Sequence, residues 1–383
     1  MNKILKVYYW SPYTSKVATI RAVLNSALSL KKYSNGKIIP KIIDAFGEWK
    51  DYSKEINNAG LDYSLLFEKK KFLKSKKIGF FKSRIYFFLI FIKCFLPLKK
   101  LILNEKPDYL IIHLLTSLPL ILNIIFKFNT KIILRISGYP KMNFFRKILW
   151  KVALKRIYLV TCPTEGTRSD IIKFNICDKT KVVVLKDPVI NVKKIFSKKN
   201  ESVEENYLNN YFLSIGRFTK QKNFLFLVKT FSEYSNSNNS KLLIIGEGEQ
   251  KAEIQNYINK NVLSNKILLL GYKKNIFPYI KKSKCFILSS LWEDPGFVIV
   301  ESAFCNKPII SSDCKNGPSE ILSGGKGGFL YKTNSKKDLL KKLNEFDQTD
   351  KIEINKMLLK TKKKIKDFTL FSHYQTINNF FIR

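Results

Sequence analysis

Two glutamates, Glu293 and Glu301, flank an apolar run behind Asp-Pro-Gly in SSLWEDPGFVIVESAFCNKPIISSD, residues 289–313. Asp294 is a favourable N-cap and Pro295 suits a first helical position, so the pattern predicts a helix that starts here. The first amides of a helix lack intrahelical acceptors, and with the helix dipole they attract anions. Glu301 would lie roughly 10 Å from Asp294 along the axis, which is about the reach of a nucleoside diphosphate. The alternative interpretation is a capped core helix with two incidental acids.

Basic residues follow an apolar run earlier in the same half of the chain. In GRFTKQKN, residues 216–223, the cations of Arg217, Lys220 and Lys222 come directly after YFLSI. Two or three of them could reach one diphosphate, although a solvated loop is the alternative. Gly271 in LLLGYKKN stands where a planar base could lie against the backbone, which is weak evidence alone.

The composition favours an enzyme without a metal or another cofactor. At 383 residues and 45% hydrophobic residues, the chain is large enough for two cores. Its six cysteines form no CxxC pair, which argues against a zinc site or a disulfide framework. The chain also lacks a DxD triplet, the usual sign of a metal held against a diphosphate.

The net charge of +39 raises the possibility of nucleic-acid binding. The excess is lysine, only eight residues are arginine, and RNP, zinc-finger and P-loop motifs are missing, so no nucleic-acid partner is expected. The skew towards Lys, Asn, Ile, Phe and Tyr is what an AT-rich genome would produce. A local mixture of basic and aromatic residues, 69–100, suits an anionic bilayer surface instead.

That segment is a poor spanning helix, because Lys93 and Pro97 interrupt it. No run of eighteen apolar residues occurs, and MNKILKVYYW is typical of a first strand rather than a signal peptide. We therefore expect a cytoplasmic protein that associates peripherally with the inner face of the membrane.

Strand-like apolar runs alternate with helix-length segments in both halves of the chain, which predicts an α/β fold with parallel sheets. We expect two Rossmann-like domains that face each other across a cleft. The expected divisions are an N-terminal domain at 1–196, a polar linker at 197–210, a C-terminal domain at 211–365, and a helix at 366–383 that returns to the first domain.

The motifs GRFTKQKN, IIGEGE, LLGYKKNI, SSLWEDPGFVIVE and SSDCKNGPSEIL arrive in that order over about a hundred residues. This ordered set resembles the retaining glycosyltransferases of family four, which have the GT-B fold. The resemblance is close over 211–332 and looser in the first domain.

The resemblance implies a role for each matching residue. Arg217 and Lys222 match the basic pair that neutralises a leaving diphosphate, and Glu301 matches the acid that binds the ribose hydroxyls. Glu293 matches the acid that faces the transferred sugar near the reacting centre. The amides that would cradle the diphosphate belong to three consecutive residues, Gly296, Phe297 and Val298.

The first domain departs from the family pattern in detail. Its loop WSPYTSKVAT replaces the glycine pair of many relatives, and Arg135 stands where many have a donor-facing histidine. His113 either faces the cleft or is a hydrogen-bonded core histidine. Lys16 is a candidate phosphate contact.

The leading hypothesis is a retaining transfer of a glycosyl group from a nucleotide sugar to a lipid-linked or surface-polysaccharide acceptor. The motif GPSEIL resembles that of relatives with uridine donors, which implies a UDP-linked hexose or N-acetylhexosamine. The alternatives are a GT-B nucleotide-sugar epimerase, an inverting transferase, or a non-enzymatic basic protein that binds membranes or nucleic acid.

Overall fold

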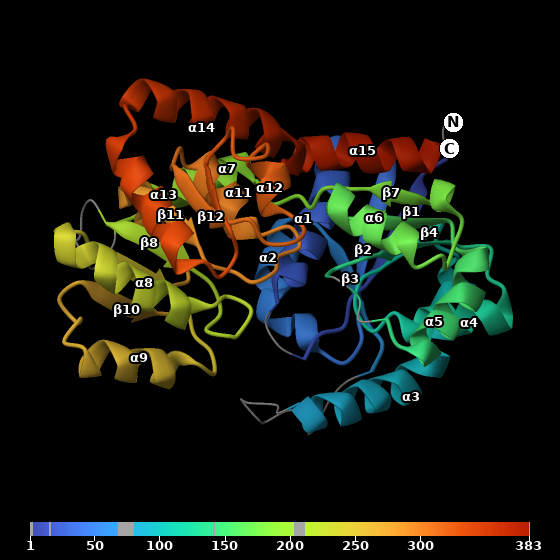
Figure 1. Cartoon of the computed structure of the whole chain (residues 1–383). Coiled ribbons are helices and arrows are strands. Elements are labelled where there is room, and N and C mark those ends of the chain that lie inside the picture. The colour runs from blue at the N-terminus through green and yellow to red at the C-terminus, as the bar shows by residue number, and fades with distance from the viewer. Residues whose placement is uncertain are drawn as a thin grey trace. The chain divides into compact units, whose positions relative to one another are not determined.

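The chain divides into two compact units in the computed structural model, which describes residues 3–14, 17–67, 80–138, 140, 142–202 and 211–382. Unit 1 contains Met1–Pro188 and Leu370–Arg383, and unit 2 contains Val189–Thr369. Each unit is built on one parallel sheet with helices on both faces (Figure 1). The expected α/β class with two Rossmann-like domains is therefore confirmed.

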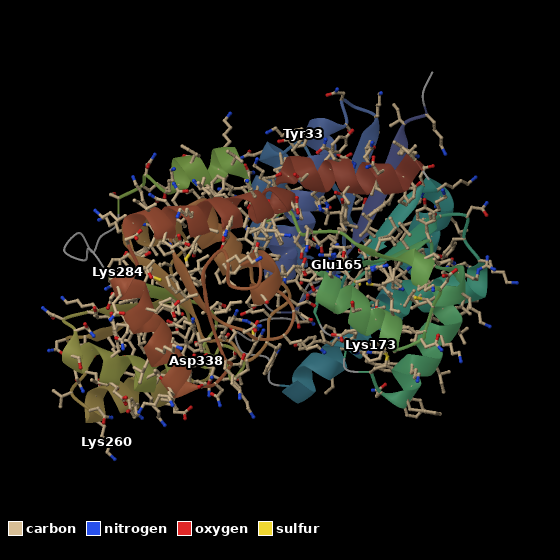
Figure 2. The ribbon with its side chains drawn as sticks, turned by 45° about the horizontal axis from the view of Figure 1, so that its top comes forward. Tyr33, Glu165, Lys173, Lys260, Lys284 and Asp338 are labelled. Carbon is tan, nitrogen blue, oxygen red and sulfur yellow. The ribbon has the colours of Figure 1, made fainter. Side chains whose placement is uncertain are left out.

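Unit 1 holds a seven-stranded sheet in the order β3-β2-β1-β4-β5-β6-β7. Its strands are β1 (Leu5–Trp10), β2 (Ile38–Asp44), β3 (Asp62–Leu65), β4 (Tyr109–Ile112), β5 (Lys131–Arg135), β6 (Leu159–Cys162) and β7 (Val182–Val184). Its helices are α1 (Ala18–Tyr33), α2 (Ser53–Asn58), α3 (Phe80–Glu105), α4 (Ser117–Phe126), α5 (Phe144–Ala153), α6 (Glu165–Lys173) and α15 (Leu370–Ile382). Glu165 and Lys173 mark the two ends of α6 in Figure 2.

Alternate residues of β1 enter different cores, as the two-residue period of a strand requires. Val7 and Tyr9 pack with α1, α2 and α15, whereas Tyr8 and Trp10 pack with α3, α4, α5 and α6. Because the sheet is buried between two helix layers, the side chains on both of its faces are apolar. This explains why the strands appear in the sequence as continuous apolar runs.

Unit 2 holds a six-stranded sheet in the order β10-β9-β8-β11-β12-β13. Its strands are β8 (Phe212–Ile215), β9 (Leu242–Ile245), β10 (Ile267–Gly271), β11 (Cys285–Leu288), β12 (Ile309–Ser312) and β13 (Phe329–Tyr331). Its helices are α7 (Val192–Lys198), α8 (Phe224–Ser237), α9 (Lys251–Lys260), α10 (Phe277–Lys282), α11 (Phe297–Phe304), α12 (Pro318–Ile321), α13 (Lys336–Gln348) and α14 (Lys351–Ile365).

The boundary between the units differs from the expected one. The chain passes from unit 1 to unit 2 after Pro188, and α7 overlaps the start of the expected linker, 197–210. Ile195 of α7 packs in a core of unit 2, which is why this segment is structured; residues 203–210 lie outside the described part of the chain.

The segment after unit 2 belongs to unit 1. A short 3-10 helix, Lys366–Phe368, still packs in unit 2, and α15 then packs against α1. Tyr109 and Tyr158 donate hydrogen bonds from their hydroxyls to the carbonyls of Phe381 (2.9 Å) and Phe380 (2.6 Å).

A buried histidine joins α15 to the rest of unit 1. His373 Nδ1 lies 2.8 Å from the carbonyl oxygen of Lys186, so this nitrogen carries the proton. Nε2 then accepts from Ser26 Oγ at 2.8 Å, and Ser26 Oγ in turn accepts from Tyr9 at 2.9 Å. Burial, together with the nearby Arg135 guanidinium, lowers the pKa of His373 to about 4, although the hydrogen bond to the Lys186 carbonyl opposes the shift.

Acidification from pH 7 to pH 5 is predicted to destabilise unit 1. The folded chain keeps His373 neutral down to a pKa of about 4, whereas the unfolded chain takes up a proton near pH 6.5. Stability is therefore lost as the pH falls through this window, by on the order of 2 kcal/mol at pH 5. Urea unfolding at several pH values measures the slope. His373→Gln keeps polar partners without titrating and should reduce the slope, while the buried His113 of the same unit contributes the remainder. An unchanged slope would contradict the prediction.

Candidate functional site

The predicted phosphate-binding residues follow the two central strands of unit 2. Strands β8 and β11 are neighbours in the sheet. After β8 the chain continues to β9 on one side, and after β11 it continues to β12 on the other side. In open α/β sheets, ligands bind outside the carboxyl ends of the strands at such a switch in direction. Arg217 and Lys222 follow β8, and Glu293 follows β11.

The structure brings Lys222 and Glu293 into direct contact. Lys222 Nζ lies 2.5 Å from Glu293 Oε1, with side-chain exposures of 14% and 6%. Ser290 Oγ donates to the same oxygen at 2.5 Å. Among the described residues, none donates a hydrogen bond to the second oxygen, Oε2, so one carboxylate oxygen accepts both side-chain contacts.

Hydrogen bonds also join the backbones of the two loops. The Leu291 amide donates to the Gln221 carbonyl at 2.8 Å, and the Gln221 side-chain amide donates to the Trp292 carbonyl at 2.9 Å. Ser289 Oγ donates to the Lys222 carbonyl at 2.7 Å. The two loops are therefore fixed relative to each other, with Lys222 and Glu293 between them.

Helix α11 begins later than the sequence indicated, so the prediction of Asp294 as N-cap is wrong. Gly296 occupies that position with φ of 95°, and the helix starts at Phe297. A left-handed residue cannot lie inside a right-handed helix, so the helix can start only after it. The amides of Gly296, Phe297 and Val298 still lie at the helix start, next to Glu293, whose Cγ would be 3.4 Å from a Cβ on Gly296.

The motif GPSEIL lies against this helix start. A Cβ on Gly317 would stand 2.0 Å from the carbonyl oxygen of Pro295, and Gly317 has φ of 141°. Only glycine permits both the approach and the backbone conformation. The close approach explains why glycine precedes Pro318 at the start of α12.

Glu301 and Gly271 lie farther from the ion pair. Glu301 is half-buried in the second turn of α11, roughly 6 Å along the axis from Phe297. Gly271 ends β10, the edge strand two places from β8, and a Cβ there would meet Glu247 Oε1 at 3.1 Å.

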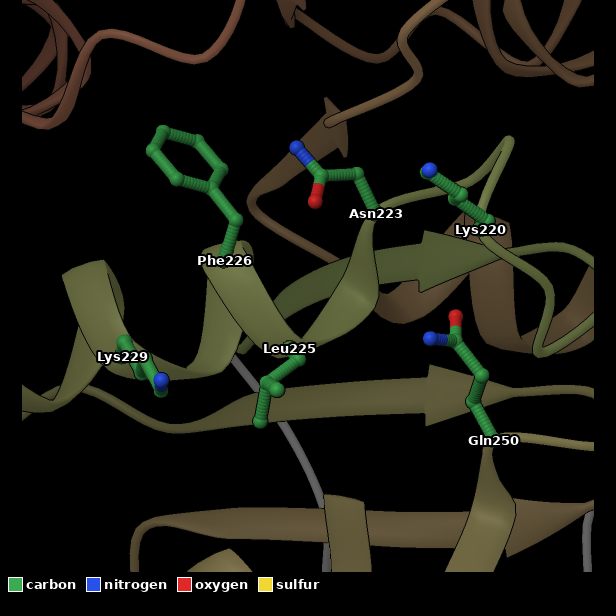
Figure 3. Close-up of a pocket in the computed structure, with 6 residues that line it drawn as sticks. All are labelled: Lys220, Asn223, Leu225, Phe226, Lys229 and Gln250. Atoms are coloured by element: carbon green, nitrogen blue, oxygen red, sulfur yellow. The ribbon is translucent and has the colours of Figure 1, made fainter. Parts of the chain in front are cut away.

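Arg217 is exposed, and its side chain forms no hydrogen bond or ion pair with the described residues. A neighbouring hollow at the start of α8 is lined by Lys220 but by neither Arg217 nor Lys222. Figure 3 shows the residues that line it, which are Lys220, Asn223, Leu225, Phe226, Lys229 and Gln250.

In unit 1, Arg135 does not present its guanidinium to solvent. The side chain is 3% exposed and forms an ion pair with Asp187 at 2.6 Å, and Nη1 donates to the Leu185 carbonyl at 2.7 Å. These internal partners argue against the expected donor-phosphate contact. Sequence reasoning missed them because Asp187 lies beyond β7, far along the chain.

His113 is the hydrogen-bonded core histidine of the two expected alternatives. It is buried, and its Nδ1 lies 3.4 Å from Ser137 Oγ. Burial, and then the charge of Arg135, hold its pKa well below the ordinary value, so the ring is neutral. Lys16 lies outside the described residues.

Within the described residues, no group of three or more His, Cys, Asp or Glu side chains is arranged to hold a metal ion. The cations expected to contact the diphosphate, Arg217 and Lys222, follow β8, whereas Lys220 lines the neighbouring hollow. The site combines these cations with the start of α11 and with the Glu293 carboxylate. Only one oxygen of that carboxylate accepts hydrogen bonds from side chains among the described residues. Such a site can bind an anionic group beside a hydroxyl-bearing one.

A family model described as "Glycosyl transferases group 1" matches residues 194–364. An uncharacterized glycosyltransferase of Methanocaldococcus jannaschii is 35% identical over 281 residues, 64% of this chain and 68% of the relative. The N-acetylgalactosamine-N,N'-diacetylbacillosaminyl-diphospho-undecaprenol 4-alpha-N-acetylgalactosaminyltransferase of Campylobacter jejuni is 28% identical over 56% of this chain and 58% of its own length.

Two solved structures have a similar fold. A glycosyltransferase from Rickettsia africae matches with a TM-score of 0.76 and 17% identity over 99% of this chain and 98% of that chain. The protein HepE of Anabaena, solved in complex with UDP, matches with a TM-score of 0.71 and 14% identity over 98% of both chains.

Gly317→Ala is predicted to destabilise unit 2 by about 1–3 kcal/mol more than Gly324→Ala. Both glycines have positive φ, but a Cβ on Gly324 meets nothing within 4 Å, whereas one on Gly317 overlaps a carbonyl oxygen. The free energy of unfolding of each variant is measured in urea. The difference between the two isolates the cost of the clash, because only Gly317→Ala introduces one. Equal losses of stability would mean that the loop 294–296 moves aside freely.

Proposed function

Since this chain belongs to the group 1 glycosyl transferases and has their GT-B fold, we propose that it is a retaining hexosyltransferase. The donor is a UDP-linked hexose or N-acetylhexosamine, and the acceptor is a lipid-linked or surface-polysaccharide glycan. The UDP bound in HepE supports the donor nucleotide, and the undecaprenol-linked acceptor named for the Campylobacter relative supports the acceptor class.

The contact of Lys222 with Glu293 is the observation that carries the proposal. It fixes an ammonium group beside the start of α11, at the switch point of the sheet. With the exposed Arg217, it forms a cationic site for the diphosphate, aided by the amides of Gly296, Phe297 and Val298. These groups stabilise negative charge that grows on the leaving UDP.

The transfer proceeds at one face of the sugar. The acceptor hydroxyl oxygen bonds to the anomeric carbon while the bond from that carbon to the phosphate oxygen breaks. The electron pair leaves with UDP, and a phosphate oxygen accepts the proton of the hydroxyl. No pair of carboxylates at glycosidase spacing is needed for this route to retention.

The two glutamates bind different parts of the donor in this proposal. Glu293 aligns the sugar through Oε2, because its Oε1 already accepts from Lys222 and Ser290. Glu301 accepts hydrogen bonds from the ribose, one turn further along α11, and the base lies against Gly271.

We also propose that the enzyme acts in the cytoplasm, held peripherally at the inner face of the membrane where a lipid-linked acceptor lies. No helix among the described residues is long and apolar enough to cross a membrane. The net charge of +39 favours attraction to anionic lipid.

A transfer assay tests the function. The purified protein is incubated with UDP-, GDP- and ADP-hexoses and undecaprenyl-diphosphate glycans of one or two sugars in detergent. We expect UDP release and a product heavier by one hexose or N-acetylhexosamine, and proton NMR should show the donor's anomeric configuration in the new bond. Consumption of GDP- or ADP-sugars alone would refute the donor, and an inverted linkage would refute retention.

Arg217→Ala and Lys222→Ala should each lower the rate of transfer about a hundredfold, or on the order of 3 kcal/mol in the transition state. The matched control is Lys220→Ala, in the same loop and also exposed, which should stay close to wild type. Single-turnover kinetics measures the effect. Thermal unfolding accompanies it, because Lys222→Ala leaves the Glu293 charge buried without its cation. Normal turnover in Arg217→Ala would remove that residue from the mechanism.

A further inference from the structure

Helix α3 is apolar on two opposite faces, although only one of them packs in the core. Ile90, Cys94, Leu98 and Ile102 recur every four residues and are buried against the sheet of unit 1. A helix that is hydrophobic all round is normally buried or in contact with lipid. The second face of α3 therefore needs an explanation.

That second face is an exposed apolar stripe, interrupted by Lys99 and Lys100 between its last two members. It runs roughly 27 Å along the helix, and each member is 46–65% exposed. We define the α3 stripe by its members, which are Ile85, Phe88, Ile92, Leu96 and Leu103. The exposed Lys93 borders it on one side.

Helix α5 carries a second exposed apolar face, which the sequence did not reveal. Phe144 and Phe145 are 73% and 81% exposed and contact each other edge to face at 5.9 Å. Ile148 and Val152 continue the face one and two turns later. The opposite side of the helix packs inward through Trp150, so the exposure of these residues does not reflect a displaced helix.

The two faces belong to neighbouring helices of one layer. Helix α4 packs against both α3 and α5, and its Ile125 is also exposed. The charged residues of α5 are all positive, namely Arg146, Lys147 and Lys151, and the one acid of α3, Glu105 at its last position, is paired with Lys41. The sequence has no acidic residue over 69–104 or over 109–164.

Charge alone does not single out this layer. Lysines stand out from helices throughout both units, as Lys260 does at the end of α9 in Figure 2. The α3–α5 layer is distinguished by large apolar side chains exposed among cations in acid-free segments. That combination is typical of a helix that lies in the interface of an anionic membrane.

We propose that α3 and α5 form a docking surface for anionic lipid. Phe144, Phe145 and the α3 stripe enter the boundary between headgroups and acyl chains, and the lysines and arginines contact lipid phosphates. A second copy of the chain fits less well, because two acid-free cationic faces would repel each other. The inference deepens the proposed function, since the surface would hold the enzyme where a lipid-linked acceptor lies. The earlier expectation concerned 69–100, of which 69–79 lie outside the described residues, and it did not include α5.

Sedimentation with vesicles tests the docking surface. Wild-type protein should bind vesicles of equal parts phosphatidylglycerol and phosphatidylcholine, and bind pure phosphatidylcholine far less. The double variant Phe144→Ser/Phe145→Ser and the separate pair Phe88→Ser/Leu96→Ser should each lower the partition coefficient about tenfold or more. The exposed side chains predict unchanged thermal unfolding. The matched control is Ile352→Ser/Leu359→Ser on the lysine-rich α14, also strongly exposed, which should bind like wild type.

Wild-type binding to anionic vesicles that survives both pairs of substitutions would overturn the proposal, because lysines alone would then suffice. Equal loss in the α14 control would overturn it too. Two results together would also overturn the proposal. These are a wild-type protein that does not bind vesicles, and a wild-type dimer in sedimentation velocity that Phe144→Ser/Phe145→Ser converts to a monomer. The assay of transfer in detergent separates this inference from the proposed function. Vesicle binding without transfer would support the docking surface and refute the proposed function. Transfer in detergent without vesicle binding would support the proposed function and refute the docking surface.

Discussion

The ion pair of Lys222 and Glu293 is the contact on which the candidate site of unit 2 depends. Two nearly buried charges would be costly to desolvate unless each is paired and hydrogen-bonded. Here the ammonium and the Ser290 hydroxyl share one carboxylate oxygen, and backbone hydrogen bonds tie the two loops together. The positions of Arg217 and of the start of α11 follow from this pairing, because each lies within a few residues of one partner.

Strand order explains why two loops more than sixty residues apart in the chain meet there. Both sheets begin in the same way, with two strands added on one side of the first strand and the fourth strand on the other. In unit 2 the first and fourth strands are β8 and β11, and in unit 1 they are β1 and β4. The common topology therefore predicts that the chain segments after β1 and β4, the second of which holds His113, leave their sheet at the same end of the strands.

The strands that carry the site could be predicted from sequence, because β8, β9 and β11 are buried apolar runs bounded by turn signals. The edge strands β3 and β13 could not, since they are short and lack a long apolar run. The charged residues after β8 and β11 were likewise visible in the sequence. Three features could not be predicted from the sequence, because each depends on tertiary contacts or on backbone conformation. They are the ion pair of Arg135 with Asp187, the hydrogen bond from Ser290 to Glu293, and the left-handed Gly296, after which α11 starts.

The position of α15 has a consequence for synthesis of the protein on the ribosome. Residues that complete the core of unit 1, such as Ile377 and Phe381, are translated only after all of unit 2. Unit 2 is one continuous segment, so it can fold as soon as it emerges, while in unit 1 the side of β4 where Tyr109 contacts Phe381 stays open until the end. A nascent chain that stops before α15 would thus present an uncovered apolar sheet face, which chaperones bind and proteases recognise.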